Sequence, residues 1–127
     1  GSRVVLATKY PDDIEYLNDI KNNRASASKT GIYSADTILI PLEDGDRAEI
    51  LKKSGKNILT IDLNPLSRTS KMSDVSIMDN IVRAIPFMTK IAEDLKSQDK
   101  AVLIELVNEF DNDENLKESL EQIRVKE

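Results

Sequence analysis

The chain contains neither cysteine nor histidine. These two absences remove thiol nucleophiles, imidazole general bases and the usual zinc ligands. Any bound metal ion would therefore be a hard cation held by oxygen atoms. The lack of cysteine, of a secretory hydrophobic region and of any apolar run of about 18 residues predicts a cytoplasmic protein that does not enter a membrane.

Glycine is also scarce, with 4 residues in the whole chain. The sequence holds neither the GxGxxG pattern of dinucleotide-binding folds nor the GxxxxGK[ST] pattern of P-loops. An ordinary P-loop or dinucleotide-binding fold is therefore not expected.

Positive charge is too thinly spread to form a nucleic-acid surface. The net charge is −5, and the segment Asp99 to Glu127 carries all of the excess, with nine acids and four bases. The preceding 98 residues are neutral, so no basic stripe is left to neutralise a phosphate backbone. DNA and RNA are therefore not expected as partners. The acidic tail would also suit a protein-interaction segment, although its acids have ordinary helical spacing.

With 127 residues the chain predicts one domain. Gly1-Ser2 is typical of a scar left by tag cleavage, so the native protein is expected to continue upstream. Residues 3–98 are predicted to form an α/β core and residues 99–127 a helical hairpin packed on it.

The first 30 residues predict a short strand, a helix and a loop. Residues 3–8 are rich in β-branched side chains, and Pro11-Asp12-Asp13 is typical of a helix start. Residues 21–30 are small and polar, with three bases and no acid. We expect a mobile, solvated loop, with a lid that grips an anion as the alternative.

A strand–helix–strand unit follows. Residues 36–40 and 57–62 are predicted as buried parallel strands, joined by a helix over residues 47–54. Asp44 or Asp46 can cap this helix, and Gly55 is its stop signal. Residues 74–78 are a weaker candidate for a third strand.

Three helices are predicted in the last 49 residues. The first begins at Asp79, and its apolar stripe is expected to pack on the sheet. The other two lie on either side of a turn at residues 111–113. The stripe of the first helix consists of Ile81, Ile85, Met88, Ala92 and Leu95.

The most promising chemistry lies between residues 62 and 69, where the chain leaves a buried strand and stays polar. Asp62 and Asn64 suit ribose hydroxyls or an adenine edge, and Arg68 offers a bidentate fork for phosphate or carboxylate. Ser67 and Thr69 can add hydroxyl donors. A loop that only forms a turn and caps a helix would explain the same residues equally well.

Two neighbouring turns can extend this site. Asp79-Asn80 lies at a helix start, where free N–H groups favour an anion, and Arg83 follows one turn later. Glu43 and Asp46, in the turn after the 36–40 strand, are possible Mg²⁺ contacts. Capping explains Asp44, and it explains Asp79 as well.

Three runs of sequence carry a resemblance to a known family. They are GIYSADTILIPLEDGDRAEIL, IDLNPLSRTSKMSDVSIMDNIVRAIPFM and, more weakly, FDNDENLKESLEQIR. They resemble the carboxyl-terminal half of archaeal phosphopantothenate synthetase, a 4-phosphopantoate–β-alanine ligase. PLEDGDR and DLNPLSRT are long and unusual strings, which makes the resemblance specific. It implies a Rossmann-like, mostly parallel α/β sheet flanked by helices, with a C-terminal helical pair.

The resemblance implies an ATP- and Mg²⁺-dependent ligase of coenzyme A biosynthesis. Such an enzyme joins 4-phosphopantoate to β-alanine through an acyl-adenylate and releases AMP and pyrophosphate. The family is cytoplasmic and homodimeric, so the resemblance implies a homodimer. Arg68 is among the ATP contacts that the resemblance implies, and we hypothesise that Arg68 is catalytic, stabilising charge on the phosphoryl oxygens. The implied ATP contacts are Asp62, Leu63, Asn64, Arg68, Thr69, Asn80 and Ile81.

Family members carry roughly as much chain again before this region. We therefore expect a carboxyl-terminal fragment that holds half of the site and is inactive without the N-terminal half. The alternative is a non-catalytic nucleotide-binding or dimerisation module.

Overall fold

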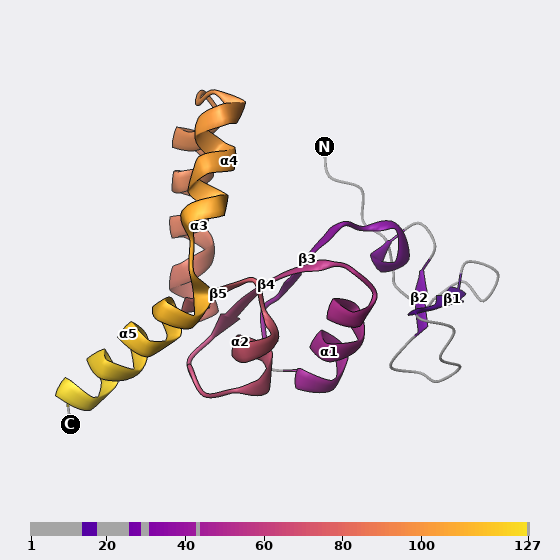
Figure 1. Cartoon of the computed structure of the whole chain (residues 1–127), viewed down its shortest axis with the longest axis horizontal. Coiled ribbons are helices and arrows are strands. Elements are labelled where there is room, and N and C mark those ends of the chain that lie inside the picture. The colour runs from indigo at the N-terminus through magenta and orange to yellow at the C-terminus, as the bar shows by residue number, and fades with distance from the viewer. Residues whose placement is uncertain (1–13, 18–25, 29–30, 43, 127) are drawn as a thin grey trace.

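The computed structural model describes residues 14–17, 26–28, 31–42 and 44–126. At its centre lies a parallel sheet of three strands in the order β3-β4-β5 (Figure 1). The strands are β3 (Thr37–Ile40), β4 (Asn57–Asp62) and β5 (Val75–Met78). The parallel α/β sheet predicted from the sequence is confirmed, and the weaker candidate strand is its third member.

Two helices connect the strands and pack against each other and β4. They are α1 (Gly45–Lys53) and α2 (Arg68–Met72). Helix α1 begins at Gly45, two residues before the predicted start, and its cap is Asp44, one of the two predicted candidates, whose carboxylate accepts a hydrogen bond of 3.2 Å from the Arg47 N–H. It is followed by Gly55, whose φ of 80° lies in the left-handed region that glycine adopts without strain.

The core lies between β3, β4 and α1. Ala48 and Leu51 on α1 pack with Ile40, Ile58 and Leu17, and all five side chains are buried. The central strand β4 is the most deeply buried, since Ile58 and Thr60 are both 0% exposed. The rigid sheet fixes where the ends of its strands lie, and these ends carry the candidate site.

The described part of the first 30 residues differs from the prediction. Ile14–Tyr16 forms strand β1, which pairs antiparallel with β2 (Ser26–Ser28), where we expected a helix and a loop. Pairing between distant segments overrides the local helix-start signal at Pro11. A 3₁₀ turn, η3 (Ile32–Ser34), leads into β3. The predicted strand at residues 3–8 lies outside the described residues, as do the bases of the loop.

The last three helices are α3 (Ile81–Leu95), α4 (Lys100–Glu109) and α5 (Asn112–Lys126). Helices α3 and α4 project from the sheet as an arm, and α5 turns back to lie against β5 (Figure 1). The prediction that the apolar stripe of α3 packs on the sheet is wrong. Only Ala84 of this helix is buried, because α3 leaves the sheet edge directly after its first turn.

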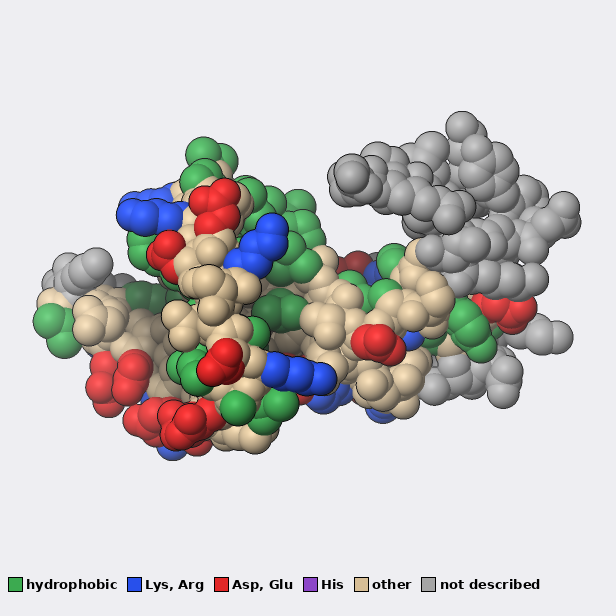
Figure 2. Space-filling model, turned by 90° about the horizontal axis from the view of Figure 1, so that it is seen from above, with side chains coloured by type: hydrophobic (Ala, Val, Ile, Leu, Met, Phe, Trp, Pro, Cys, Tyr) green, Lys and Arg blue, Asp and Glu red, His purple; other side chains and the backbone are tan. Residues whose placement is uncertain are grey.

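Hydrophobic side chains therefore remain at the surface of the α3–α4 arm. Figure 2 looks down on the arm and shows them beside the charged residues of its tip. Val82 is 82% exposed on α3 and Val107 is 74% exposed on α4. None of the helices in the described ranges combines the length and the apolar character that crossing a lipid bilayer requires.

Candidate functional site

A cavity of about 320 Å³ lies at the carboxyl ends of the three strands. At such an edge of a parallel sheet the chain turns away into helices, and ligands commonly bind in the space between. The cavity joins the loop after β3, the end of β4 and the start of α3. Its lining residues are Pro41, Leu42, Ile61, Asp62, Leu63, Asp79, Asn80 and Ile81.

The Asp62 carboxylate shapes the wall that follows β4. One of its oxygens accepts hydrogen bonds from the Leu63 and Asn64 N–H groups, at 2.7 and 3.1 Å. The other accepts from the hydroxyls of Ser67, at 2.5 Å, and Ser70, at 3.3 Å. Both oxygens are therefore engaged in holding the turn that Asp62 begins.

Asn64 stabilises the same turn from its far side. Its side-chain oxygen accepts from the Leu66 N–H at 2.9 Å, and its carbonyl oxygen accepts from the Ser70 hydroxyl at 3.0 Å. The turn thus presents ordered backbone at the rim of the cavity. Leu63, which is 69% exposed, projects from it.

The wall opposite is the beginning of α3. The Asn80 side chain caps this helix by accepting a hydrogen bond of 2.9 Å from the Arg83 N–H. The first N–H groups of α3 and the positive end of its dipole therefore lie at the cavity, next to Asn80 and Ile81. The structure assigns the cap to Asn80, whereas the sequence argument had given capping to Asp79.

Asp79 is paired with Arg83 across one turn. The Arg83 guanidinium donates to the Asp79 carboxylate at 2.8 and 2.6 Å, and this hydrogen bond lowers the pKa of Asp79 below its usual value. The pair brings an anion and its partner cation to the rim. Arg83 is exposed and lies beside the cavity without lining it.

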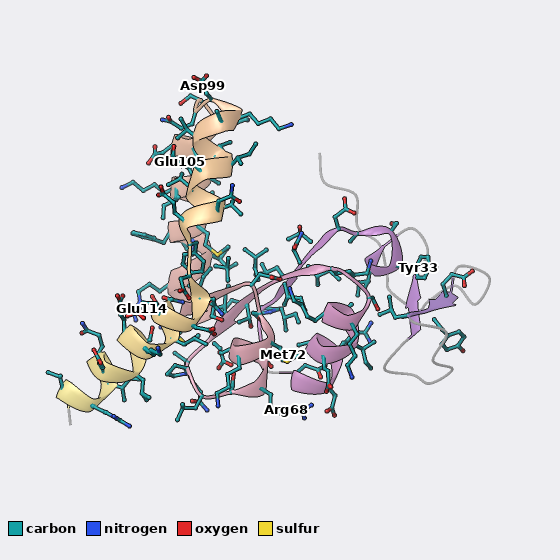
Figure 3. All side chains as sticks on the ribbon, viewed as in Figure 1. Tyr33, Arg68, Met72, Asp99, Glu105 and Glu114 are labelled. Carbon is teal, nitrogen blue, oxygen red and sulfur yellow. The ribbon has the colours of Figure 1, made fainter. Side chains whose placement is uncertain are left out.

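Arg68 faces α1 and does not line the cavity. Its guanidinium donates to Asp46 at 2.8 Å and to Glu49 at 3.1 Å. Figure 3 shows Arg68 below α2, on the side of α1. The hydrogen bond and charge of Asp46 raise the pKa of Arg68. Contact with a ligand in the cavity requires the guanidinium to leave these two carboxylates.

Thr69 is fully buried behind the cavity. Its hydroxyl accepts a hydrogen bond of 2.9 Å from the Asp44 N–H and so joins the start of α2 to the start of α1. Ser67 caps α2 by accepting from the Ser70 N–H at 3.0 Å. Both hydroxyls therefore serve the architecture of the wall in this structure.

The structure thus brings together four of the seven implied ATP contacts, which are Asp62, Leu63, Asn80 and Ile81, and adds Asp79 from the same turn. Asn64, Arg68 and Thr69 lie behind or beside the cavity. Sequence reasoning missed Pro41 and Leu42, which line its third side. They directly follow β3, so the rule that ligands lie at strand ends could have identified them.

The possible contacts for a metal ion are Glu43 and Asp46. Asp46 is paired with Arg68, and Glu43 lies outside the described residues. The parts of the chain that the structure describes contain no group of three His, Cys, Asp or Glu side chains that could hold a metal. Any Mg²⁺ at this site would therefore need further oxygen atoms from a phosphate ligand or from water.

Comparison with known proteins shows which family this chain belongs to. The model of the family described as "Phosphopantothenate/pantothenate synthetase" matches residues 1–126. A relative named 4-phosphopantoate–β-alanine ligase, from Thermococcus onnurineus, is 43% identical over 124 residues, covering 91% of this chain and 48% of its own length.

Two further relatives have the same name. The one from Methanosarcina mazei is 46% identical over 106 residues, covering 84% of this chain and 42% of its own length. The one from Thermococcus kodakarensis is 42% identical over 124 residues, with 91% and 48% covered. This chain therefore spans just under half the length of these relatives. It belongs to the phosphopantothenate/pantothenate synthetase family.

Proposed function

We propose that this chain forms the ATP-binding part of a ligase that condenses 4-phosphopantoate with β-alanine. The observation that carries the proposal is the cavity at the strand ends, with the ordered Asp62 turn on one side and the start of α3 on the other. The relatives that share this sequence are named for that reaction. The cavity is within the size range of small-molecule sites, which begins at about 300 Å³.

In this proposal the two walls divide the nucleotide between them. The turn at Asp62, Leu63 and Asn64 takes the ribose and base, because it is held in one conformation at the rim of the cavity and the exposed Asn64 side chain keeps its amide N–H groups for a ligand. The N-terminus of α3, at Asn80 and Ile81, takes phosphate oxygens, because free N–H groups and the helix dipole favour negative charge.

Arg68 is the proposed catalytic cation. It exchanges Asp46 and Glu49 for phosphate oxygens when ATP binds, and so stabilises the charge that develops during carboxylate activation. Glu43 and Asp46 carry the hard oxygen donors that would suit a Mg²⁺ ion bound with ATP, and such an ion would add to the charge neutralisation.

This chain provides the cavity at the strand ends, and the other half of the ligase completes the site. We therefore expect no ligase activity from the chain alone. Two features support this expectation: the cavity is open, and the chain spans 42 to 48% of the relatives' length. As the resemblance implies, the assembled enzyme works in the cytoplasm.

The test uses a fusion ligase, in which this chain is joined to the part of the Thermococcus onnurineus ligase that it does not match. AMP formation is followed with ATP, 4-phosphopantoate and β-alanine. Asn80→Asp retains a good helix cap but places a negative charge at the proposed phosphate site. We expect it to raise the KM for ATP at least about tenfold, an effect near 1.4 kcal/mol.

The matched control is Asn80→Ser, which also caps the helix but adds no charge. We expect it to leave the KM for ATP within about threefold of the parent. Equal effects of the two substitutions, or a fusion ligase that forms no AMP, would contradict the proposed role of α3.

The α3–α4 arm favours the alternative function of dimerisation, which is compatible with the first. Its exposed apolar residues include Ile85, Val107 and Phe110, and contiguous apolar surface of this kind commonly marks an interface. A second copy of the chain is the proposed partner, because the resemblance implies a homodimer.

Light scattering after size-exclusion chromatography tests this assembly. Val107→Glu is expected to convert the dimer to a monomer by burying a charge at the interface. Val125→Glu, at a position on α5 that is also highly exposed and lies away from the arm, serves as the control and should leave the dimer intact. A monomeric parent chain would refute the proposal.

A further inference from the structure

The beginning of α5 is attached to the edge of the sheet by two asparagine side chains. The Asn112 side-chain oxygen accepts a hydrogen bond of 2.9 Å from the Ser76 N–H, and the Asn115 amide donates to the Ser76 carbonyl at 2.8 Å. Ser76 lies on β5, the edge strand. The two side chains therefore take the place of a neighbouring strand and cover the open edge.

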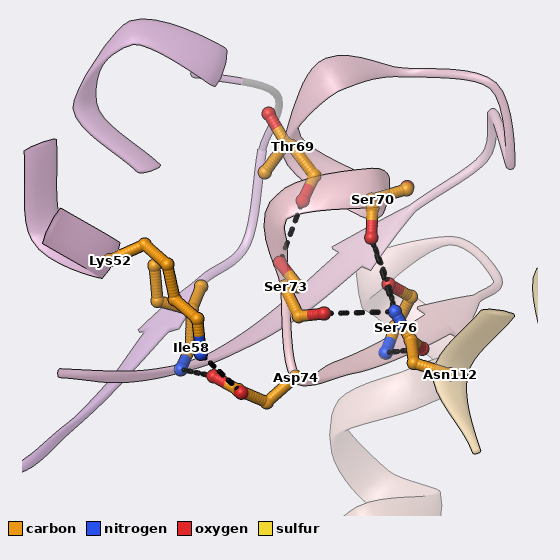
Figure 4. A network of polar contacts seen from close by, with 8 residues as sticks. All are labelled: Lys52, Ile58, Thr69, Ser70, Ser73, Asp74, Ser76 and Asn112. Carbon is orange, nitrogen blue, oxygen red and sulfur yellow. Dashed lines mark hydrogen bonds and ion pairs between the residues drawn. The ribbon is translucent and has the colours of Figure 1, made fainter. Parts of the chain in front are cut away.

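Asn112 also donates hydrogen bonds to α2 and its cap. Among the described contacts, Asn115 makes no such hydrogen bond. The Asn112 amide nitrogen lies 3.2 Å from the Ser70 carbonyl oxygen and 3.0 Å from that of Ser73 (Figure 4). The Ser76 hydroxyl donates to the same Ser70 carbonyl at 2.9 Å. The backbone at Ser70 is thus held from α5 and from β5 at once.

Ser70 in turn holds the wall of the cavity. Its side chain is fully buried, and its hydroxyl reaches the Asn64 carbonyl at 3.0 Å and the Asp62 carboxylate at 3.3 Å. Hydrogen bonds therefore run without a break from Asn112, through Ser70, to Asp62 and Asn64. The described polar side chains along this path leave no buried atom without a partner.

We propose that Asn112 is a positioning residue for the turn at residues 62–64, acting through Ser70. It fixes the position and orientation of α2 relative to β5, and Ser70 on α2 in turn fixes the conformation of the turn at residues 62–64. Loss of the Asn112 amide would let the start of α2 move, and the turn would become less ordered although no group that touches the cavity has changed. That the ordered turn serves ATP rests on the proposed function above; the coupling itself does not.

The contrast between Asn112 and Asn115 gives a matched pair of variants. Asn112→Asp preserves size and the oxygen that accepts from Ser76, but it replaces the donor to Ser70 and Ser73 with a second acceptor. Asn115→Ala removes the hydrogen bond to the Ser76 carbonyl and one of 3.3 Å to the Asn112 side-chain oxygen, but it keeps the Asn112 amide that donates to Ser70 and Ser73. A purely structural role for α5 predicts similar effects of both.

The first measurement is amide hydrogen exchange in the complete 127-residue chain. We expect Asn112→Asp to speed exchange of the Leu63, Asn64 and Leu66 amides about tenfold or more, corresponding to one lost hydrogen bond. We expect Asn115→Ala to change these amides by less than about twofold. Equal acceleration by both variants, or none by Asn112→Asp, would overturn the proposal. If Asn112→Asp does not fold, Asn112→Ala, which also removes the donor to Ser70 and Ser73, decides by the same criterion.

The second measurement links the coupling to ATP. In the fusion ligase we expect Asn112→Asp to raise the KM for ATP at least about fivefold while the KM for β-alanine stays within about twofold. An unchanged KM for ATP together with faster exchange would overturn the link to the ligand. Absence of ATP turnover in the unsubstituted fusion would instead count against the proposed function, and hydrogen exchange would still decide the coupling.

Discussion

Replacing Asp62 by alanine tests how much the turn at residues 62–64 contributes to stability and how much it contributes to ATP binding. The carboxylate accepts four hydrogen bonds, and a hydrogen bond to a charged group typically contributes about 1.5–3 kcal/mol. The free energy of unfolding lost in Asp62→Ala should nevertheless be far smaller than four times that value. Leu63 and Asn64 are exposed, so water replaces the carboxylate at their N–H groups.

The two hydroxyl donors also retain other partners. The Ser67 hydroxyl can donate to the Ser70 hydroxyl oxygen at 3.0 Å, and the Ser70 hydroxyl donates to the Asn64 carbonyl oxygen at 3.0 Å. No buried donor is therefore left unsatisfied, and we expect Asp62→Ala to lower the free energy of unfolding by about 1–2 kcal/mol. The affinity for ATP should fall about tenfold or more, because the turn that meets the ligand is no longer ordered.

Urea unfolding of the chain measures the first quantity, and ATP titration of the fusion ligase measures the second. Asp62→Asn is the control, since its one remaining oxygen can still accept from Leu63 and Asn64. It should recover most of the stability. A loss above about 4 kcal/mol would show that Asp62 supports the core itself, and unchanged ATP affinity would separate the turn from the ligand.

Three other substitutions test the fold and the site. Leu51→Ala removes a side chain that is 1% exposed, and it should lower the free energy of unfolding by about 2–5 kcal/mol in urea titrations; a smaller loss would contradict the assigned core. Burial raises the pKa of Asp74, but hydrogen bonds from Lys52 and the Ile58 N–H outweigh it and leave the pKa below its ordinary 3.8. Stability from Asp74 is therefore fully present above pH 3.8 and is lost as the pH falls through the lowered value. Asp74→Asn should be about 1 kcal/mol less stable near neutral pH, and thermal melts should show this difference shrinking below about pH 4, whereas a constant difference would refute the ion pair. Arg68→Ala removes exposed ion pairs and should leave the melting temperature nearly unchanged while it reduces AMP formation by the fusion ligase; an unchanged rate would refute the catalytic assignment.

The parallel sheet was predictable because each of its elements has local signals. The β-branched runs at residues 37–40 and 57–62, the cap at Asp44 and the stop at Gly55 all specify the same strand–helix–strand unit. Parallel strands bring their carboxyl ends to one edge. Asp62 and Asn80 could therefore be expected near each other although 18 residues separate them.

Other parts of the site depend on contacts that no local pattern encodes. Helix α2 has five residues, too few for an apolar repeat to indicate a helix. The contacts of Arg68 with Asp46 and of Thr69 with Asp44 span 22 and 25 residues, so no local pattern indicates that these side chains lie away from the cavity. The Asn112 contacts span still more of the chain.

The α3 stripe shows a different limit of sequence reasoning. Its spacing correctly predicts a helix with one apolar face, but spacing does not say which surface covers that face. The sheet was the nearest candidate within the chain, and the structure instead leaves the face exposed on the α3–α4 arm. Similarly, residues 14–16 were expected to be helical but form strand β1. Its partner, β2, lies in the segment that was expected to be a loop.

The central claim is that the cavity at the strand ends binds ATP. Titration of the ¹⁵N-labelled fusion ligase with ATP and Mg²⁺, followed by amide chemical shifts, tests it most directly. We predict that the largest shift changes fall on Asp62, Leu63, Asn80 and Ile81, and that Asn80→Asp abolishes them at the same ATP concentration. Saturable binding whose largest changes fall on α5 or on the α3–α4 arm, with these four amides unmoved, would contradict the account.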